Sequence, residues 1–214
     1  MLIVGFICDM FYQRMVILMI TFLGKSISLF LCRKNIIDEE EADIYKYGFE
    51  SILSTILGFI ITLLMGVVFM MGLMSVIYYL IFVTVRQMTG GYHADSYLKC
   101  NITFSLVTFF VLGMTKLLCA SQMYSLMVHL LLLIISAICI WRFSPVENPN
   151  KTLTPEQKSR NHKAAMIILL ALCILSSALY ALKNEYAVLI ALTLFSISML
   201  IIIAIMKGGQ EEHE

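Results

Sequence analysis

A histidine and a cysteine lie close together in a short polar segment between two apolar runs. The segment, residues 86–100, reads RQMTGGYHADSYLKC and contains His93 and Cys100, whereas residues 77–85 and 102–111 are almost wholly apolar. A thiol attacks as the thiolate, and an imidazole can take its proton and return it to a leaving group. These residue types predict a cysteine nucleophile with its base. The alternative is a solvated loop histidine beside an incidental cysteine.

The spacing of this pair places a demand on the backbone. On one continuous helix, residues seven apart share a face but lie about 10 Å apart along the axis, too far for a hydrogen bond. Either the chain bends between His93 and Cys100, or the substrate closes the gap. The pair Gly90 and Gly91, just before the histidine, offers the freedom for a turn.

Three neighbours are candidate supporting residues. A third group often orients a catalytic imidazole, and Asp95 and Ser96 are the nearest candidates. Arg86 can hold a peptide carboxylate or stabilise charge that develops in the transition state. The alternative for Arg86 is an anchor at a helix end that extends its charge to the membrane surface.

Composition places this chain in a membrane. Of its 214 residues, 60% are hydrophobic and only 14% are charged, where soluble domains carry about a quarter. Its net charge of +1 gives no indication of nucleic-acid binding. The six cysteines are scattered singly, which favours neither a disulfide framework nor a zinc site, and no metal or cofactor is expected.

The apolar runs predict an all-α integral membrane protein with about six transmembrane helices, because a span needs about 20 residues. The run at 73–85 is too short alone and must borrow length from the polar segment, tilt, or be partly re-entrant. Residues 1–31 contain Asp9, Arg14 and Lys25, which favours an N-terminal interfacial amphipathic helix over an additional span at 15–31. We expect the other spans at 51–71, 102–118, 124–141, 164–182 and 187–205.

We expect one domain over 1–214, with an amphipathic and cytoplasmic region at 1–48 and a helical core at 49–206. Basic residues indicate its orientation. If Arg33 and Lys34 are cytoplasmic, six spans place residues 86–100 and the polar loop at 142–163 on the same side. The catalytic segment is therefore expected at the cytoplasmic face of the cell membrane.

The spacing of Arg86, Gly91, His93 and Cys100 resembles the AgrB family of accessory gene regulator proteins, which act in Gram-positive quorum sensing. The loop 145–151, PVENPNK, which ends at Lys151, is also similar to a proline-then-lysine pattern of that family. The resemblance covers most of residues 40–206.

This resemblance implies a membrane cysteine endopeptidase that removes the C-terminal segment of an AgrD-type propeptide. Cys100 would be the nucleophile and His93 the base. The acyl group would rest on Cys100 as a thioester until an internal cysteine of the peptide captures it as a thiolactone, or a serine as a lactone. Arg86 and Gly91 match positions important for activity in the family. A homodimer is also implied.

Basic residues of the 142–163 loop, Lys151 among them, can attract the acidic tail of such a peptide, although positive charge on the inner side needs no substrate to explain it. Two other functions remain open at this point. A carrier or transporter of a signalling peptide predicts that Cys100→Ser is tolerated. A membrane scaffold or chaperone predicts peptide binding without a new C-terminus.

Overall fold

The computed structural model describes residues 21–34, 36–90, 97–121, 124–146 and 154–211. Several of the residues predicted to form the site lie outside these ranges, namely Gly91, His93, Asp95, Ser96 and Lys151. The interfacial helix or span predicted within 1–31 also lies largely outside them.

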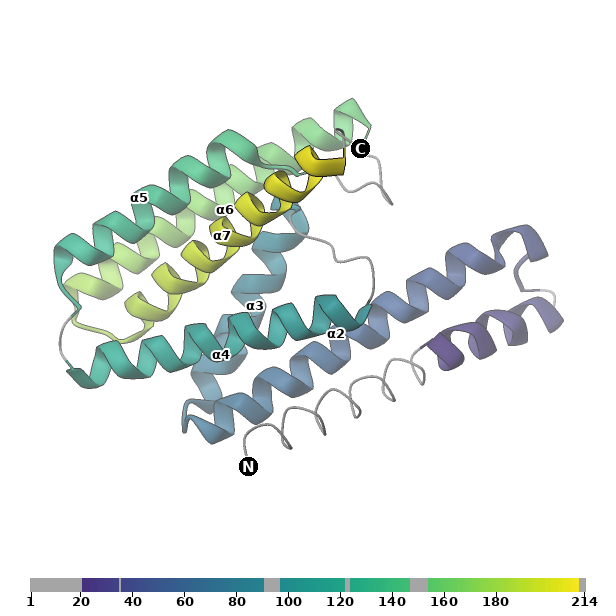
Figure 1. The fold of residues 1–214 in the computed structure, drawn as a ribbon, viewed down its shortest axis with the longest axis horizontal. Helices are drawn as coiled ribbons and strands as arrows, with labels where there is room; N and C mark the ends of the chain where they lie inside the picture. Colours follow the sequence, from purple (N-terminus) through teal and green to yellow (C-terminus); the bar gives the residue numbers. More distant parts are fainter. Residues whose placement is uncertain (1–20, 35, 91–96, 122–123, 147–153, 212–214) are drawn as a thin grey trace. The chain divides into compact units, whose positions relative to one another are not determined.

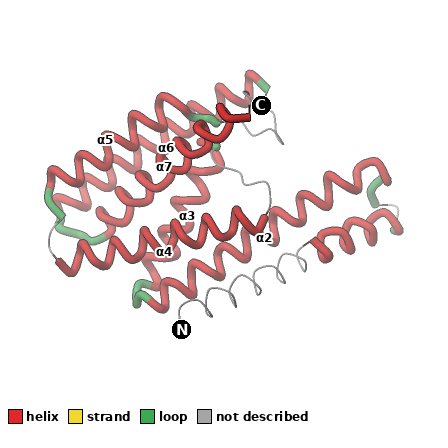
Figure 2. The backbone as a smooth tube through the Cα atoms, viewed as in Figure 1, coloured by secondary structure: helices red, strands yellow, loops and turns green. Residues whose placement is uncertain are grey.

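The described residues form helices joined by short turns, with no strand among them (Figures 1 and 2). Residues 21–33 are helical. The elements that follow are the 3₁₀ turn η1 (Glu39–Glu41), α2 (Ala42–Val68), α3 (Gly72–Thr89), α4 (Tyr97–Ser121), α5 (Leu126–Phe143), α6 (Pro155–Ala181) and α7 (Tyr186–Glu211).

The prediction of an all-α membrane protein is confirmed. Over the described residues, 6 helices are long and apolar enough to cross a bilayer. Large apolar side chains such as Ile134, Ile138, Leu170 and Ile174 are exposed on the outer faces of these helices, as a lipid environment requires. The chain is therefore a multi-pass membrane protein.

Polar residues extend two helices beyond the predicted spans. The short run at 73–85 gains its length from the polar segment, because α3 starts at Gly72 and continues to Thr89. The prediction of a polar loop through residue 163 was wrong in its second half. There, α6 begins at Pro155, and the side chain of Thr154 accepts a hydrogen bond from the Gln157 amide in a capping box.

The described chain divides into two compact units, and the boundary between them falls within α2 and again within α4. The first unit comprises Met1–Ile61 and Ala94–Ser105, and the second comprises Thr62–His93 and Leu106–Glu214. The prediction of one domain over 1–214 stays a prediction.

Helix α7 is the centre of the second unit. In its most apolar stretch 67% of the residues are buried, against 17% in α6. It packs against α3, α5 and α6, and α5–α7 run side by side in Figure 1. Leu189, Leu194 and Ile201 are fully buried there. This core positions the C-terminal ends of α3 and α5, from which the polar segments leave the bundle.

In the first unit, the helix at residues 21–33 packs closely against α2. The hydroxyl of Ser28 donates a hydrogen bond of 2.6 Å to the carbonyl oxygen of Ala42. Gly24 lies over the Glu50 side chain, and a Cβ at this position would come within 2.7 Å of Glu50 Cγ. A glycine at position 24 therefore leaves the space that the Glu50 side chain occupies.

Candidate functional site

Cys100, the predicted nucleophile, is the fourth residue of α4. Its thiol is not in a disulfide and its side chain is half-buried. The first N–H groups of a helix lack intrahelical acceptors, and they carry the positive end of the helix dipole. Negative charge on a sulfur, or on a carbonyl oxygen under attack, is therefore favoured at this end of α4.

The described part of α4 begins at Tyr97 and does not include His93. His93 itself lies outside the described residues, as do Gly91, Asp95 and Ser96. The predicted pairing of His93 with Cys100 stays a prediction.

Arg86 lies in the last turn of α3, one turn after Phe82. Its guanidinium carbon is 5.8 Å from the centroid of the Phe82 ring, within the range of a cation–π contact. Phe82, Val85 and Thr89 are buried on the inner face of α3, whereas Arg86 is half-buried. Arg86 therefore lies near the helix end with its aliphatic stem along apolar surface, an arrangement that suits both an anchor and an anion-binding group.

Gly90 ends α3 with a conformation that favours glycine. Its φ is 67° and its ψ is −149°, a region that residues with a Cβ rarely adopt. The residue pairs with Val146 in an isolated β-bridge, and the Val146 amide donates a 2.9 Å hydrogen bond to the carbonyl oxygen of Thr89. A Cβ on Gly90 would overlap the carbonyl oxygen of Val146. The close approach of the two backbones therefore depends on glycine.

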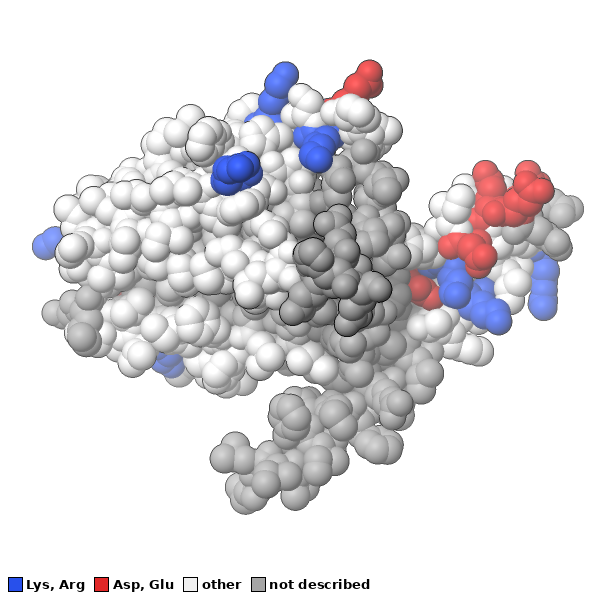
Figure 3. Space-filling model, turned by 45° about the horizontal axis from the view of Figure 1, so that its top comes forward, with Lys and Arg blue, Asp and Glu red and all other residues white. Residues whose placement is uncertain are grey.

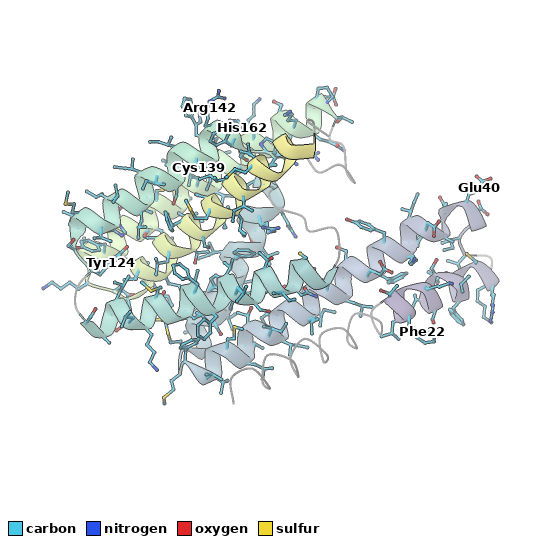
Figure 4. All side chains as sticks on the ribbon, in the orientation of Figure 1. Phe22, Glu40, Tyr124, Cys139, Arg142 and His162 are labelled. Carbon is cyan, nitrogen blue, oxygen red and sulfur yellow. The ribbon has the colours of Figure 1, made fainter. Side chains whose placement is uncertain are left out.

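His162 holds the same loop from α6. Its Nδ1 is 2.7 Å from the carbonyl oxygen of Ser144, and since a carbonyl can only accept, the imidazole donates this hydrogen bond. His162 and Arg142 lie at one end of the second unit, as Figure 4 shows. Nothing in the local sequence of His162 indicates this long-range partner.

Basic side chains collect at this end of the second unit, and several Lys and Arg side chains gather at one edge of the surface in Figure 3. Arg142 ends α5, and Lys158 and Arg160 are exposed in the first two turns of α6. Because the Gly90–Val146 pairing joins the ends of α3 and α5, Arg86 belongs to this end as well. The predicted orientation of these residues toward the cytoplasm stays a prediction.

The opposite end contains a cluster of aromatic rings around the buried His129, and Tyr124 of this cluster is labelled in Figure 4. Tyr124 Oη and His129 Nδ1 are 2.8 Å apart, and the His129 ring stacks on Tyr180 of α6 at 4.7 Å. Burial, reinforced by the neighbouring Tyr180 and Cys119, raises the pKa of the Tyr124 hydroxyl, which stays protonated at neutral pH. His129 therefore joins α5 to α6 by ring stacking, whereas its hydrogen bond to Tyr124 is local.

Sequence reasoning missed a polar cluster in the first unit, next to Cys100. The Ser54 hydroxyl of α2 donates a 3.2 Å hydrogen bond to Oδ1 of Asn101, the residue that follows Cys100 in α4. Glu50 lies one helical turn before Ser54. Both Glu50 and Asn101 are 5% exposed. The available signal was an acidic residue and an asparagine at the ends of two apolar runs, because buried polar groups at such positions need partners.

The fold defines a multi-pass helical membrane protein with a partly exposed cysteine at the start of one helix and an arginine at the end of another. The family model for Accessory gene regulator B matches residues 24–206. The chain belongs to this family, which confirms the resemblance stated from its motif.

Two curated relatives, both from Clostridium perfringens, are named "Putative AgrB-like protein 2" (strain 13 / Type A) and "Putative AgrB-like protein" (strain SM101 / Type A). Each is 23% identical to this chain over 138 residues, which is 63% of this chain and 64% of the relative. The alignment thus spans less than two thirds of the length of these relatives. No solved structure matches the chain.

Proposed function

We propose that this protein is a membrane cysteine endopeptidase that processes an AgrD-type propeptide in quorum sensing. The observation that carries the proposal is the half-buried, unbridged thiol of Cys100 in the first turn of α4, in a chain of the accessory gene regulator B family. A nucleophile at a helix N-terminus has N–H groups nearby that favour the negative charge formed during attack.

In the proposed reaction, His93 takes the proton of the Cys100 thiol, and the thiolate attacks the scissile carbonyl carbon. A C–S bond forms, the peptide C–N bond breaks, and the imidazolium returns the proton to the departing amine. The N-terminal part of the propeptide is then a thioester on Cys100. An internal cysteine thiol of the peptide attacks this thioester, which releases Cys100 and closes a thiolactone ring.

The exchange of one thioester for another is nearly balanced in free energy, so the outcome depends on excluding water from the acyl-enzyme. A position at the membrane interface serves this purpose. In the same proposal the basic end of the second unit faces the cytoplasm, and Lys151, Lys158 and Arg160 attract the acidic tail of the peptide. Gly91 allows the backbone turn before His93, Asp95 or Ser96 orients its imidazole, and the protein acts as a homodimer.

The test is processing of the AgrD-type peptide encoded beside this protein by purified protein in liposomes, followed by intact mass. Wild type should release the tail and form a cyclic product, whereas Cys100→Ala and His93→Ala should form neither. A covalent peptide adduct on Cys100 would identify the nucleophile. If wild type binds the peptide but leaves it intact, as both variants do, the protein is a carrier and the peptidase proposal is wrong.

A further inference from the structure

Two buried polar atoms near Cys100 have no hydrogen-bond partner. They are Oε1 of Glu50, an acceptor, and Nδ2 of Asn101, a donor. Each belongs to a side chain that is only 5% exposed. A buried polar atom without a partner destabilises a folded protein, so such atoms are uncommon and often mark a binding site.

The two atoms belong to one polar cluster of the first unit. The Ser54 hydroxyl donates to Oδ1 of Asn101 and thereby fixes which side of the amide group faces α2. The NH₂ group of Asn101 is left as the unused donor. Glu50 is four residues before Ser54 on α2, a separation of about 6 Å along the helix axis and on the same face.

This donor and acceptor match the chemistry of a peptide backbone. Each residue of an extended peptide offers one C=O acceptor and one N–H donor, and it advances about 3.3 Å along the chain. Asn101 directly follows Cys100 in the chain, in the first two turns of α4.

We infer that Glu50 and Asn101 form a subsite for the backbone of the propeptide beside the cleavage point, an inference that rests on the proposed function. Asn101 Nδ2 donates to a backbone carbonyl of the substrate, and Glu50 Oε1 accepts from a backbone N–H. Ser54 is a positioning residue that orients the Asn101 amide. Recognition of backbone groups holds the peptide segment in place without requiring particular side chains of the peptide.

The subsite is tested by peptide binding in a Cys100→Ala background, where cleavage cannot interfere. The variants are Glu50→Met and Asn101→Leu, which keep the side-chain volume close to the original. We expect each to weaken binding of the uncut propeptide at least tenfold. Ser105→Ala is the matched control on α4, because the Ser105 hydroxyl bonds only to the backbone of its own helix, at Asn101 O. It should bind like the parent.

Thermal unfolding separates this role from a structural one. Because Glu50→Met removes a partnerless polar atom, its Tm in detergent should equal or exceed that of the parent. Asn101→Leu also removes the acceptor of the Ser54 hydroxyl, so its Tm is expected to fall by no more than that of Ser54→Ala. A structural role predicts a lower Tm together with weaker binding. Propeptides N-methylated at one backbone amide at a time provide a second measurement. The methyl group that removes the N–H bound by Glu50 should weaken binding to the parent but not to Glu50→Met.

The outcomes distinguish this inference from the proposed function. If wild type cleaves the propeptide and both variants bind it with unchanged affinity, the subsite is wrong and the peptidase stands. If wild type never cleaves but the variants lose binding, the backbone subsite stands in a carrier. Lower Tm in both variants, with no N-methyl position that depends on Glu50, would overturn the subsite in favour of a structural role.

Discussion

Replacement of Gly90 by alanine should open the junction between α3 and the loop after α5. Its φ of 67° and ψ of −149° cost a residue with a Cβ about 1–3 kcal/mol. The added Cβ would also meet the Val146 carbonyl oxygen, and it would lie 3.1 Å from both the carbonyl carbon and the amide nitrogen of Val146. Relief requires the two backbones to separate, with loss of the Val146–Thr89 hydrogen bond at about 0.5–1.5 kcal/mol.

The sum is about 1.5–4.5 kcal/mol, which reduces the closed arrangement about 10- to 2,000-fold relative to the open one. Hydrogen exchange of the Val146 amide, followed in lipid nanodiscs, should accelerate in Gly90→Ala by at least about 10-fold. Peptide processing should fall in parallel, because the segment that holds Gly91 and His93 begins at this junction.

Gly72→Ala is the matched control, since a Cβ there meets nothing within 4 Å and Gly72 also lies at an end of α3. Exchange at Val146 and processing should both stay at wild-type levels in this control. If Gly90→Ala also retains wild-type exchange at Val146, the steric account of this junction is refuted.

Three further substitutions test local features of the second unit. Thr154→Ala removes the N-cap of α6 and should lower the unfolding free energy by about 1 kcal/mol in a detergent denaturation series. His162→Ala removes the donor to the Ser144 carbonyl; exchange at Val146 should rise several-fold, and His162→Asn, which retains a donor, should restore part of the protection. Lys183→Gly should raise the unfolding free energy by about 0.5–1 kcal/mol, because Lys183 has a φ of 54° after the end of α6; no gain in Tm would contradict this expectation.

The spans were predictable because their signal is local. A run of about 20 apolar residues identifies a membrane helix wherever it packs. The ends of the helices were harder to predict from the sequence. Helix α6 extends from its apolar part back to Pro155 through charged residues, which a hydropathy pattern assigns to a loop. The local signal for this helix start was Thr154 and Pro155 with Gln157 two residues later, because a capping box and an N-terminal proline mark a helix start in polar sequence.

The candidate site, too, could be predicted only where its signal is local. Arg86 and Cys100 could be identified from residue type and spacing, and the structure places them at the end of α3 and the start of α4. The bond between Ser54 and Asn101 joins residues 47 apart in the sequence. No local pattern specifies which turn of α2 meets α4, so the polar cluster that includes Asn101 could be found only in the folded chain.

The backbone pairing of Gly90 with Val146 connects two segments that the sequence presents as separate features. The proposed catalytic segment continues from Gly90, and the loop that leads to Lys151 continues from Val146. A shift of either backbone at this pairing therefore changes the starting point of the other segment. Because His162 holds Ser144 from α6, a third helix fixes the same junction. Attraction of an acidic peptide tail to the basic end of the second unit would thus act on a loop that is physically tied to the start of the catalytic segment.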